Sequence, residues 1–363
     1  MRVVFVNSAD RWGGNEKWTC EAANGLRARG HEVLLVGQTQ LLADKASSYG
    51  IPFRRLRLRG DGDIIGVIRL SRLFRRIDPD AVILTKVREY WLGGLAAKLA
   101  KARKIYFRIG IDRPVQRNIK YKLSFGRICD TFIVNSPSVR DILLEAPFIE
   151  PERIEVVPNG VSLDAAGEVD PAFFTSLGVP SGSIVVGATG RLAKQKGFDV
   201  LIRAFKTVRS EYADAFLVIA GDGHERKDLA RRVRQLDLSK SVLMPGFVKD
   251  MQSFYDGLSI FVLPSRFEGM PNVLLEAMAA RVPVIASDVS GVSGLIEDRK
   301  TGHLVPAEDP EQLAERMIEL LGSEEQRKAL AQRARRLVET HYRLDGMLDR
   351  LEKVLSGNSK DRS

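Results

Sequence analysis

The part of the sequence that most restricts the fold is residues 264–286, which read PSRFEGMPNVLLEAMAARVPVIA. The short apolar run that ends at Pro264 predicts a buried strand, and residues 265–270 predict a turn that contains a glycine. Residues 271–280 predict a helix, because a proline and an asparagine suit its cap and first turn and an apolar stripe follows. Residues 282–286 predict a second buried strand. Together they form a βαβ unit, whose ligand edge lies at the carboxyl end of the first strand.

Two carboxylates fall on this predicted edge. Glu268 lies in the turn, and Glu276 lies about one helical turn past Asn272. The helix N-terminus between them presents backbone N–H groups that suit phosphate oxygens. A carboxylate on each side of a bound anion is expected only if the carboxylates bind hydroxyl groups, such as those of a sugar and a ribose. The spacing alone leaves an alternative open, in which Glu276 complements the helix dipole and Glu268 is a solvated loop residue.

This stretch resembles the E-x7-E signature of the large family of retaining glycosyltransferases numbered four, also called group 1, whose members have the two-domain GT-B fold. The resemblance implies that Glu268 contacts hydroxyl groups of a donor sugar during catalysis and that Glu276 contacts the nucleotide ribose. It also implies that the intervening segment binds the donor, through Gly269, Met270, Pro271, Asn272 and Val273. The family usually has glycine where Arg281 stands. Because an arginine in a left-handed helix cap would cost about 1 kcal/mol, we expect this helix to end differently.

A second pair of charges follows another predicted strand, residues 184–189. Arg191 and Lys196 lie five residues apart just beyond the strand, where two cations could each neutralise an oxygen of a diphosphate. Surface pairs of this kind are common, so the pattern alone is weak. The segment GR-x4-KG nevertheless resembles the donor-pyrophosphate motif of the same family, which implies a catalytic role for both cations. The resemblance further implies that the nucleotide base binds near the backbone of Phe247 and Val248.

The first half of the chain alternates predicted strands and helices from residue 2 onward, which indicates a parallel sheet with helices on both faces. Gly13 and Gly14 open the first helix without a G-x-G-x-x-G pattern, which argues against an NAD or FAD site. They could serve only an unusual turn, but the resemblance implies a glycine loop that binds the donor. Many family members have a histidine near the anomeric carbon, at the end of the strand predicted at residues 104–108. Here Arg108 and Asp112 stand there, so they are the catalytic candidates.

The predicted fold class is α/β of the GT-B type, with two Rossmann-like doubly wound domains facing a cleft. The length of the chain predicts two domains. The resemblance implies that the first, residues 1–158, binds the acceptor and that the second, residues 159–340, binds the nucleotide-sugar donor. The apolar residues of the last segment keep to one face and predict a C-terminal helix over residues 341–356. The resemblance implies that this helix crosses back to the first domain.

The net charge of +10 is uneven along the chain. Residues 1–158 contain 28 Lys and Arg against 17 Asp and Glu, whereas the remainder contains 28 against 29. Arginines at helical spacing within residues 69–77 flank an apolar stripe formed by Leu70, Leu73, Phe74 and Ile77. This pattern predicts an interfacial helix at an anionic membrane that carries a lipid-linked or phosphorylated glycan acceptor. The alternative is a basic domain that packs the stripe into its own core.

We therefore expect a retaining, metal-independent glycosyltransferase that moves a sugar from a UDP- or GDP-sugar to an acceptor hydroxyl. The resemblance suggests synthesis of cell-envelope glycan, lipopolysaccharide or glycolipid, with no further cofactor. A GT-B isomerase or phosphorylase remains an alternative. A nucleic-acid-binding protein would explain the basic half, but basic strands studded with aromatic residues are missing and the glutamate pair would have no role. No apolar run approaches the ~20 residues that are needed to span a bilayer. We therefore expect the protein in the cytoplasm, and we hypothesise that it associates with the inner face of the membrane as a peripheral protein.

Overall fold

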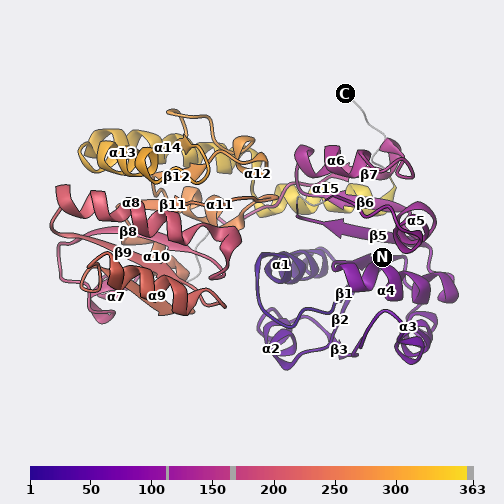
Figure 1. Ribbon diagram of the computed structural model, residues 1–363. Helices are drawn as coiled ribbons and strands as arrows, with labels where there is room; N and C mark the ends of the chain where they lie inside the picture. The colour runs from indigo at the N-terminus through magenta and orange to yellow at the C-terminus, as the bar shows by residue number, and fades with distance from the viewer. Residues whose placement is uncertain (112–113, 164–168, 358–363) are drawn as a thin grey trace. The chain divides into compact units, whose positions relative to one another are not determined.

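A computed structural model describes residues 1–111, 114–163 and 169–357 of the chain (Figure 1). The chain divides into two compact units. Unit 1 comprises Met1–Asn159 together with Asp345–Ser363, and unit 2 is the continuous segment Gly160–Leu344. Each unit contains one parallel sheet with its own apolar core.

The sheet of unit 1 has seven strands in the order β3-β2-β1-β4-β5-β6-β7, all of them parallel to their neighbours. Its central strands are buried on both faces, which is why they are runs of apolar residues rather than alternating patterns. The strands are β1 (Arg2–Asn7), β2 (Glu32–Gly37), β3 (Phe53–Arg55), β4 (Ala81–Leu84), β5 (Lys104–Ile109), β6 (Thr131–Val134) and β7 (Ile154–Val156).

The helices of unit 1 connect these strands and pack on the sheet. They are α1 (Gly14–Ala28), α2 (Gln40–Ser48), α3 (Ile64–Ile77), α4 (Val87–Ala100), α5 (Ile119–Leu123), a π-helical turn η1 (Ser124–Ile128), α6 (Pro137–Leu144), a 3-10 turn η2 (Pro151–Arg153) and, from the end of the described chain, α15 (Leu344–Ser356).

The sheet of unit 2 has six strands in the order β10-β9-β8-β11-β12-β13. They are β8 (Ile184–Thr189), β9 (Ala215–Ala220), β10 (Val242–Gly246), β11 (Ile260–Leu263), β12 (Val284–Ser287) and β13 (His303–Val305). The helices are α7 (Phe173–Ser176), η3 (Lys194–Lys196), α8 (Phe198–Glu211), α9 (Arg226–Gln235), α10 (Met251–Asp256), α11 (Asn272–Ala279), α12 (Ser290–Ser293), α13 (Pro310–Leu321) and α14 (Glu324–His341).

Both sheets are doubly wound around their first strand. In unit 1 the order reverses between β1 and β4, and in unit 2 it reverses between β8 and β11. Loops that leave the two strands on either side of such a reversal diverge to opposite faces and open a crevice at the carboxyl edge of the sheet, where ligands of this fold class bind. The two Rossmann-like sheets expected from the sequence are therefore present, each with one switch point.

The C-terminal helix α15 belongs to unit 1, as the resemblance to the GT-B family implied. A side chain at Gly25 of α1 would lie 2.3 Å from a methyl group of Leu348, so the glycine permits close approach of the two helices. Arg29 lies 2.6 Å from both Asp349 and Glu352. The predicted start at residue 341 is wrong, since α14 continues to His341 and α15 begins at Leu344.

The predicted interfacial stripe of α3 is also corrected by the structure. Leu70 and Phe74 are fully buried in the core of unit 1, and Leu73 and Ile77 pack against that core. The stripe is the inward face of a helix that packs on α4, so it is not available to a membrane. No helix in the described part of the chain combines the length and apolar character needed to cross a bilayer.

The end of α11 differs from the expectation as well. Arg281 has a φ of +59° and occupies the left-handed position that usually favours glycine. Its N–H donates to the Met278 carbonyl at 3.1 Å, and the Val282 N–H donates to the Ala277 carbonyl at 3.0 Å. These two bonds form a Schellman motif, so the chain keeps the family's helix end and accepts the strain of a non-glycine residue.

The first prediction concerns this strain. Replacing Arg281 by glycine should raise the free energy of unfolding by about 0.5–1 kcal/mol, because glycine adopts positive φ without steric cost. Urea denaturation of the two proteins measures the difference. Ala280→Gly is the matched control, because Ala280 has a φ of −80° and gains no relief, so its stability should fall. A loss of stability in both variants would contradict the assignment of strain to Arg281.

The second prediction concerns His303 in β13. The side chain is fully buried and neither ring nitrogen has a hydrogen-bond partner among the described residues, and burial lowers the pKa of His303 below its usual 6.5. The unfolded chain therefore binds a proton that the native state resists, and stability should fall as the pH drops below about 6.5. His303→Leu should flatten this slope in urea titrations at several pH values, whereas exposed His224→Gln should leave it unchanged. An identical slope in His303→Leu would refute the prediction.

Candidate functional site

The switch point of unit 2 brings two of the predicted motifs to one edge. The loop from Gly190 to Gly197 follows β8, and residues 264–271 follow the adjacent strand β11. Gly197 has a φ of +62°, and a Cβ there would lie 1.8 Å from the carbonyl oxygen of Pro264. Glycine is therefore needed for both its dihedral angle and the close packing of the two loops.

Lys196 and Glu268 meet across these loops. The Nζ of Lys196 lies 2.5 Å from Oε1 of Glu268, and the same oxygen accepts a hydrogen bond of 2.6 Å from the hydroxyl of Ser265. Glu268 is 6% exposed and Ser265 is fully buried. A charge-assisted contact in such surroundings is stronger than on the surface, so it fixes the position of both charged groups.

A second ion pair supports the same loops from outside. The guanidinium of Arg266 binds both carboxylate oxygens of Asp199, at 2.9 and 3.0 Å, and its Nε lies 2.5 Å from Glu308. The Arg266 backbone N–H also donates to the carbonyl of Gln195 at 2.8 Å. Hydrogen bonding to Asp199, opposed by partial burial, raises the pKa of Arg266 above its usual value. These contacts hold the turn after β11 against the start of α8.

Helix α11 begins directly after this turn. Pro271 is its N-cap and makes no side-chain capping bond, and Asn272 is the first helical residue. The positive end of the helix dipole therefore points toward the edge that holds Lys196 and Glu268. Glu276, one turn further, accepts a hydrogen bond of 3.0 Å from the hydroxyl of Tyr255. Burial and the carboxylate of Glu276 raise the pKa of this tyrosine well above 10.

The remaining predicted donor residues of unit 2 lie along the same edge. Arg191 is exposed in the loop after β8. Phe247, with 61% of its surface exposed, follows β10 directly after Gly246, which has a φ of +87°. Val248 comes next and packs against the core. Since β10 is separated from β8 only by β9, the edge runs from the aromatic ring of Phe247 past Arg191 to Glu268.

Sequence reasoning missed several residues that shape this site. A Cβ at Gly291 would lie 2.3 Å from the carbonyl oxygens of both Glu268 and Gly269, so this glycine lets α12 pack against the turn. Ser265 orients Glu268 from within the same turn, and Tyr255 of α10 orients Glu276 of α11. The only available signal for Gly291 was its place in the S-G-V-S-G segment after the second strand of the βαβ unit.

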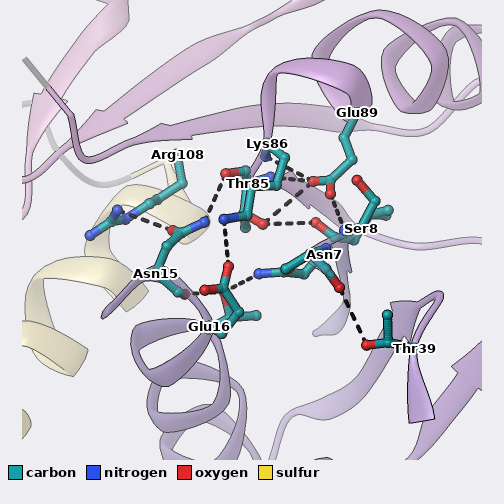
Figure 2. A network of polar contacts seen from close by, with 12 residues as sticks. Asn7, Ser8, Asn15, Glu16, Thr39, Thr85, Lys86, Glu89 and Arg108 are labelled. Carbon is teal, nitrogen blue, oxygen red and sulfur yellow. Dashed lines mark hydrogen bonds and ion pairs between the residues drawn. The ribbon is translucent and has the colours of Figure 1, made fainter. Parts of the chain in front are cut away.

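Unit 1 has a buried polar network at its own switch point (Figure 2). Glu89, in the first turn of α4, accepts hydrogen bonds from the backbone N–H groups of Ser8, Thr85 (2.7 Å) and Lys86 (2.9 Å). Burial raises the pKa of Glu89 to about 7, although the bonds from Ser8 and Thr85 act in the opposite direction. The carboxylate thereby ties the end of β1 to the loop after β4.

The glycine loop lies next to this network. Gly13 is the N-cap of α1 and Gly14 its first residue, and no side chain caps the helix. Glu16, in the first turn, forms an ion pair of 2.5 Å with Lys86. The side-chain amide of Asn15 donates to the carbonyl of Thr85 at 2.9 Å. These contacts hold the first turn of α1 against the loop that follows β4 (Figure 2).

Arg108 is the charged residue that faces this helix turn from β5. It is 5% exposed and donates to the side-chain oxygens of Asn15, at 3.2 Å, and Asn159, at 2.8 Å. Its guanidinium lies 4.5 Å from the ring centre of Trp18. Within the described ranges, no carboxylate lies at ion-pair distance from Arg108. Burial lowers the pKa of Arg108 to about 10, opposed by the charge of Glu16, so the group stays a cation at neutral pH.

The structure thus gathers Arg191, Lys196, Glu268 and Glu276 at one edge of unit 2, and the glycine pair and Arg108 at one edge of unit 1. Asp112 lies outside the described residues. Among the residues that are described, no three His, Cys, Asp or Glu side chains are grouped as a metal ion would require.

Comparison with known proteins matches both halves of the chain to one kind of enzyme. Residues 12–165 match the family described as Glycosyltransferase Family 4, and residues 169–337 match the family described as Glycosyl transferases group 1. The chain is 25% identical over 351 residues to a lipopolysaccharide core biosynthesis glycosyltransferase of Rhizobium meliloti, with 95% of this chain and 96% of the relative covered. It is 27% identical over 285 residues, about three quarters of each chain, to a galactosyltransferase of Escherichia coli that acts on N-acetylglucosaminyl-diphosphoundecaprenol.

Solved structures agree with this assignment at the level of the fold. The crystal structure of HepE of Anabaena in complex with UDP and glucose has a TM-score of 0.88 to this chain at 19% identity, and the match covers 98% of this chain and all of HepE. One family description matches each half of the chain, and both describe glycosyltransferases. Together with the architecture, these matches lead to one conclusion: the chain is a GT-B-fold glycosyltransferase and belongs to family 4, group 1.

Proposed function

We propose that this enzyme is a retaining, metal-independent glycosyltransferase that uses a nucleoside-diphosphate sugar and transfers the sugar to a hydroxyl group of a cell-envelope glycan or glycolipid. The contact that carries the proposal is the pair of Lys196 and Glu268 at the switch point of unit 2, beside the N-terminus of α11. A cation, a helix dipole and a carboxylate at one edge match the three parts of such a donor, namely its phosphates, its leaving oxygen and its sugar hydroxyls.

Metal independence is proposed because the chain itself supplies positive charge for the diphosphate. Arg191 is exposed in the loop after β8, and Lys196 lies at the end of the same loop. The N-terminus of α11 adds its partial positive charge. Together these groups would stabilise the charge that grows on the leaving diphosphate, which is the role that a divalent cation would otherwise fill.

Retention is proposed to follow from substitution on a single face of the sugar. The bond between the anomeric carbon and the phosphate oxygen breaks, and the acceptor oxygen bonds to the same face of that carbon. The acceptor proton passes to the leaving phosphate oxygen. Glu268 suits the positioning of sugar hydroxyls better than attack on the anomeric carbon, because its Oε1 already accepts hydrogen bonds from Lys196 and Ser265.

Arg108 is proposed to be a catalytic residue of unit 1, in the place where family members have a histidine. It is a buried cation held by Asn15 and Asn159, next to the uncapped N-terminus of α1. A preorganised cation in low-dielectric surroundings stabilises negative charge more strongly than an exposed one. Asp112 stays a candidate from its place in the sequence.

The class of acceptor is inferred from the relatives. One acts in lipopolysaccharide core biosynthesis and another on a diphosphoundecaprenol-linked sugar, so we propose an acceptor of the same general kind. The nucleotide is proposed to be UDP or GDP, with no separate cofactor, and nucleic acid is not an expected partner. The proposed site of action is the cytoplasmic side of the membrane.

The experiment that tests the donor site uses Arg191. Because its side chain is exposed, Arg191→Ala should leave stability unchanged while it weakens binding of UDP or GDP, whichever binds the wild type, by about 10–100-fold, the cost of a lost charge-assisted hydrogen bond. Isothermal titration calorimetry measures the dissociation constant. Lys194→Ala is the matched control, since Lys194 is an exposed cation of the same loop that the proposal gives no role.

An unchanged dissociation constant in Arg191→Ala, or an equal loss in Lys194→Ala, would reject the phosphate assignment. Lys196 is a poorer first test, since its removal would leave buried Glu268 without its cation and would destabilise the fold as well. Sugar transfer that survives in the presence of EDTA is the expected outcome for metal independence.

The two glutamates should differ in the step that they affect. Glu276→Gln should weaken binding of the nucleotide by about tenfold, because a charged acceptor for ribose hydroxyls is lost. Glu268→Gln should chiefly lower turnover, and its nucleotide affinity should stay the same or rise, because Lys196 is then no longer neutralised. Calorimetry and initial rates separate the two effects. Small and equal effects of both substitutions would mean that neither carboxylate contacts the donor.

A further inference from the structure

Unit 1 exposes a group of large apolar side chains that its core does not use. Ile64, Ile65 and Ile68 in the first half of α3 are 72%, 63% and 43% exposed, and Ile119 at the start of α5 is 77% exposed. Single exposed apolar residues are ordinary, but β-branched side chains repeated on successive positions of one helix face are not. We call these four residues the isoleucine patch.

The patch occupies one region of the surface. Lys120, the neighbour of Ile119, has its Nζ 2.5 Å from Asp61, which lies in the loop that leads into α3. This ion pair brings the start of α5 to the start of α3, and both helices lie at the same end of unit 1 (Figure 1, right). The inward face of α3 is formed by Val67, Leu70 and Phe74, so Ile64, Ile65 and Ile68 lie outside that core.

Positive charge surrounds the patch. The exposed side of α3 continues from Ile68 into arginines, and no residue of the helix is acidic; the exposed basic residues of α3 and α5 and of the segments before them are Arg57, Arg59, Arg69, Arg72, Arg75, Arg76, Arg117 and Lys122. Two acidic residues lie near the patch in the described part of the chain, and both have partners. Asp61 pairs with Lys120, and Asp63 caps α3 by accepting from the N–H groups of Gly66 and Arg59, which lower its pKa.

We propose that the isoleucine patch and its arginines are a docking surface for an anionic lipid bilayer. Exposed alkyl groups next to a cluster of positive charges suit the boundary between acyl chains and negatively charged headgroups. There the alkyl groups insert among the acyl chains and the cations contact phosphates. A protein partner or a second copy of the chain could cover the isoleucines. It would not place negative charge opposite all of the exposed arginines of α3, as an anionic bilayer does. The surface lies in unit 1 alone, so this proposal does not depend on the donor chemistry proposed for unit 2.

Sedimentation of the full chain with vesicles tests the proposal. Wild type should bind vesicles of phosphatidylglycerol and phosphatidylcholine, should bind phosphatidylcholine alone weakly, and should lose affinity as salt screens the charges. Arg69, Arg72 and Arg76 changed together to serine should weaken binding at low salt by about 100-fold, at roughly fivefold for each basic residue. Changing Arg231 and Arg234 to serine in unit 2 is the matched control and should have little effect, because their helix has no exposed apolar neighbours of this kind.

The apolar part is tested separately. Ile64, Ile65 and Ile68 changed together to serine should lower affinity at least tenfold, whereas Leu41→Ser, an exposed leucine on α2, should not. Unchanged UDP or GDP binding and an unchanged melting temperature show that the variants are folded. In a second measurement, a polarity-sensitive dye is attached to the cysteine of Ile65→Cys. The dye can be attached selectively because Cys20 and Cys129 are buried. Its emission should shift to the blue when anionic vesicles are added.

Three results would overturn the proposal. The first is no binding to anionic vesicles at low salt. The second is binding that the isoleucine variant leaves unchanged, with no shift of the dye. The third is a wild type that dimerises in analytical ultracentrifugation without lipid while the isoleucine variant stays monomeric, since the patch would then be an interface between copies of the chain.

Discussion

All the chemistry described above depends on one constraint, the parallel pairing of β1 with β4 and of β8 with β11. Parallel strands end at the same edge of a sheet, so loops far apart in the sequence are delivered to one place. Lys196 and Glu268 are 72 residues apart, yet their charged atoms are 2.5 Å apart because β8 and β11 are neighbours. In unit 1 the same rule brings Glu89 of α4 to the backbone at the end of β1, and lets Asn15 reach the loop after β4. The sites are therefore products of strand order first and of side-chain identity second.

The two edges handle buried charge in different ways. In unit 2 the charged groups are paired with one another, Lys196 with Glu268 and Arg266 with Asp199, so the resting site is nearly neutral. In unit 1 buried Arg108 is held by two neutral amides and an indole ring, which stabilise its charge, and no carboxylate among the described residues pairs with it. A diphosphate that binds at the first kind of edge must compete with a carboxylate, whereas an anion at the second kind gains the full attraction of the cation.

The sequence was sufficient for the βαβ unit around Glu268, since length, apolar runs and a proline at a helix start are local signals. It also indicated both switch-point loops through their glycines and charges. What it could not supply were contacts between distant segments, such as Tyr255 with Glu276 or Arg108 with Asn159. The expectation for Arg281 was wrong because a local dihedral cost was weighed without the two backbone hydrogen bonds that oppose it. The stripe of α3 was assigned to the wrong surroundings, because helical periodicity identifies an apolar face but not what covers it.

The division of the chain between the units has a consequence for how the protein is made. Unit 2 is one uninterrupted segment, Gly160–Leu344, whereas unit 1 is built from residues on either side of it. On the ribosome the seven strands of the first unit emerge before its last helix does, and the groove on α1 that Gly25 opens for Leu348 stays empty until the whole of unit 2 has been synthesised. Unit 2 can acquire its core as it emerges, but the first domain to appear is the last to be completed. During that interval the apolar surface that later packs on Met347, Leu348 and Leu351 is exposed to solvent, and it is the surface on which a chaperone would act.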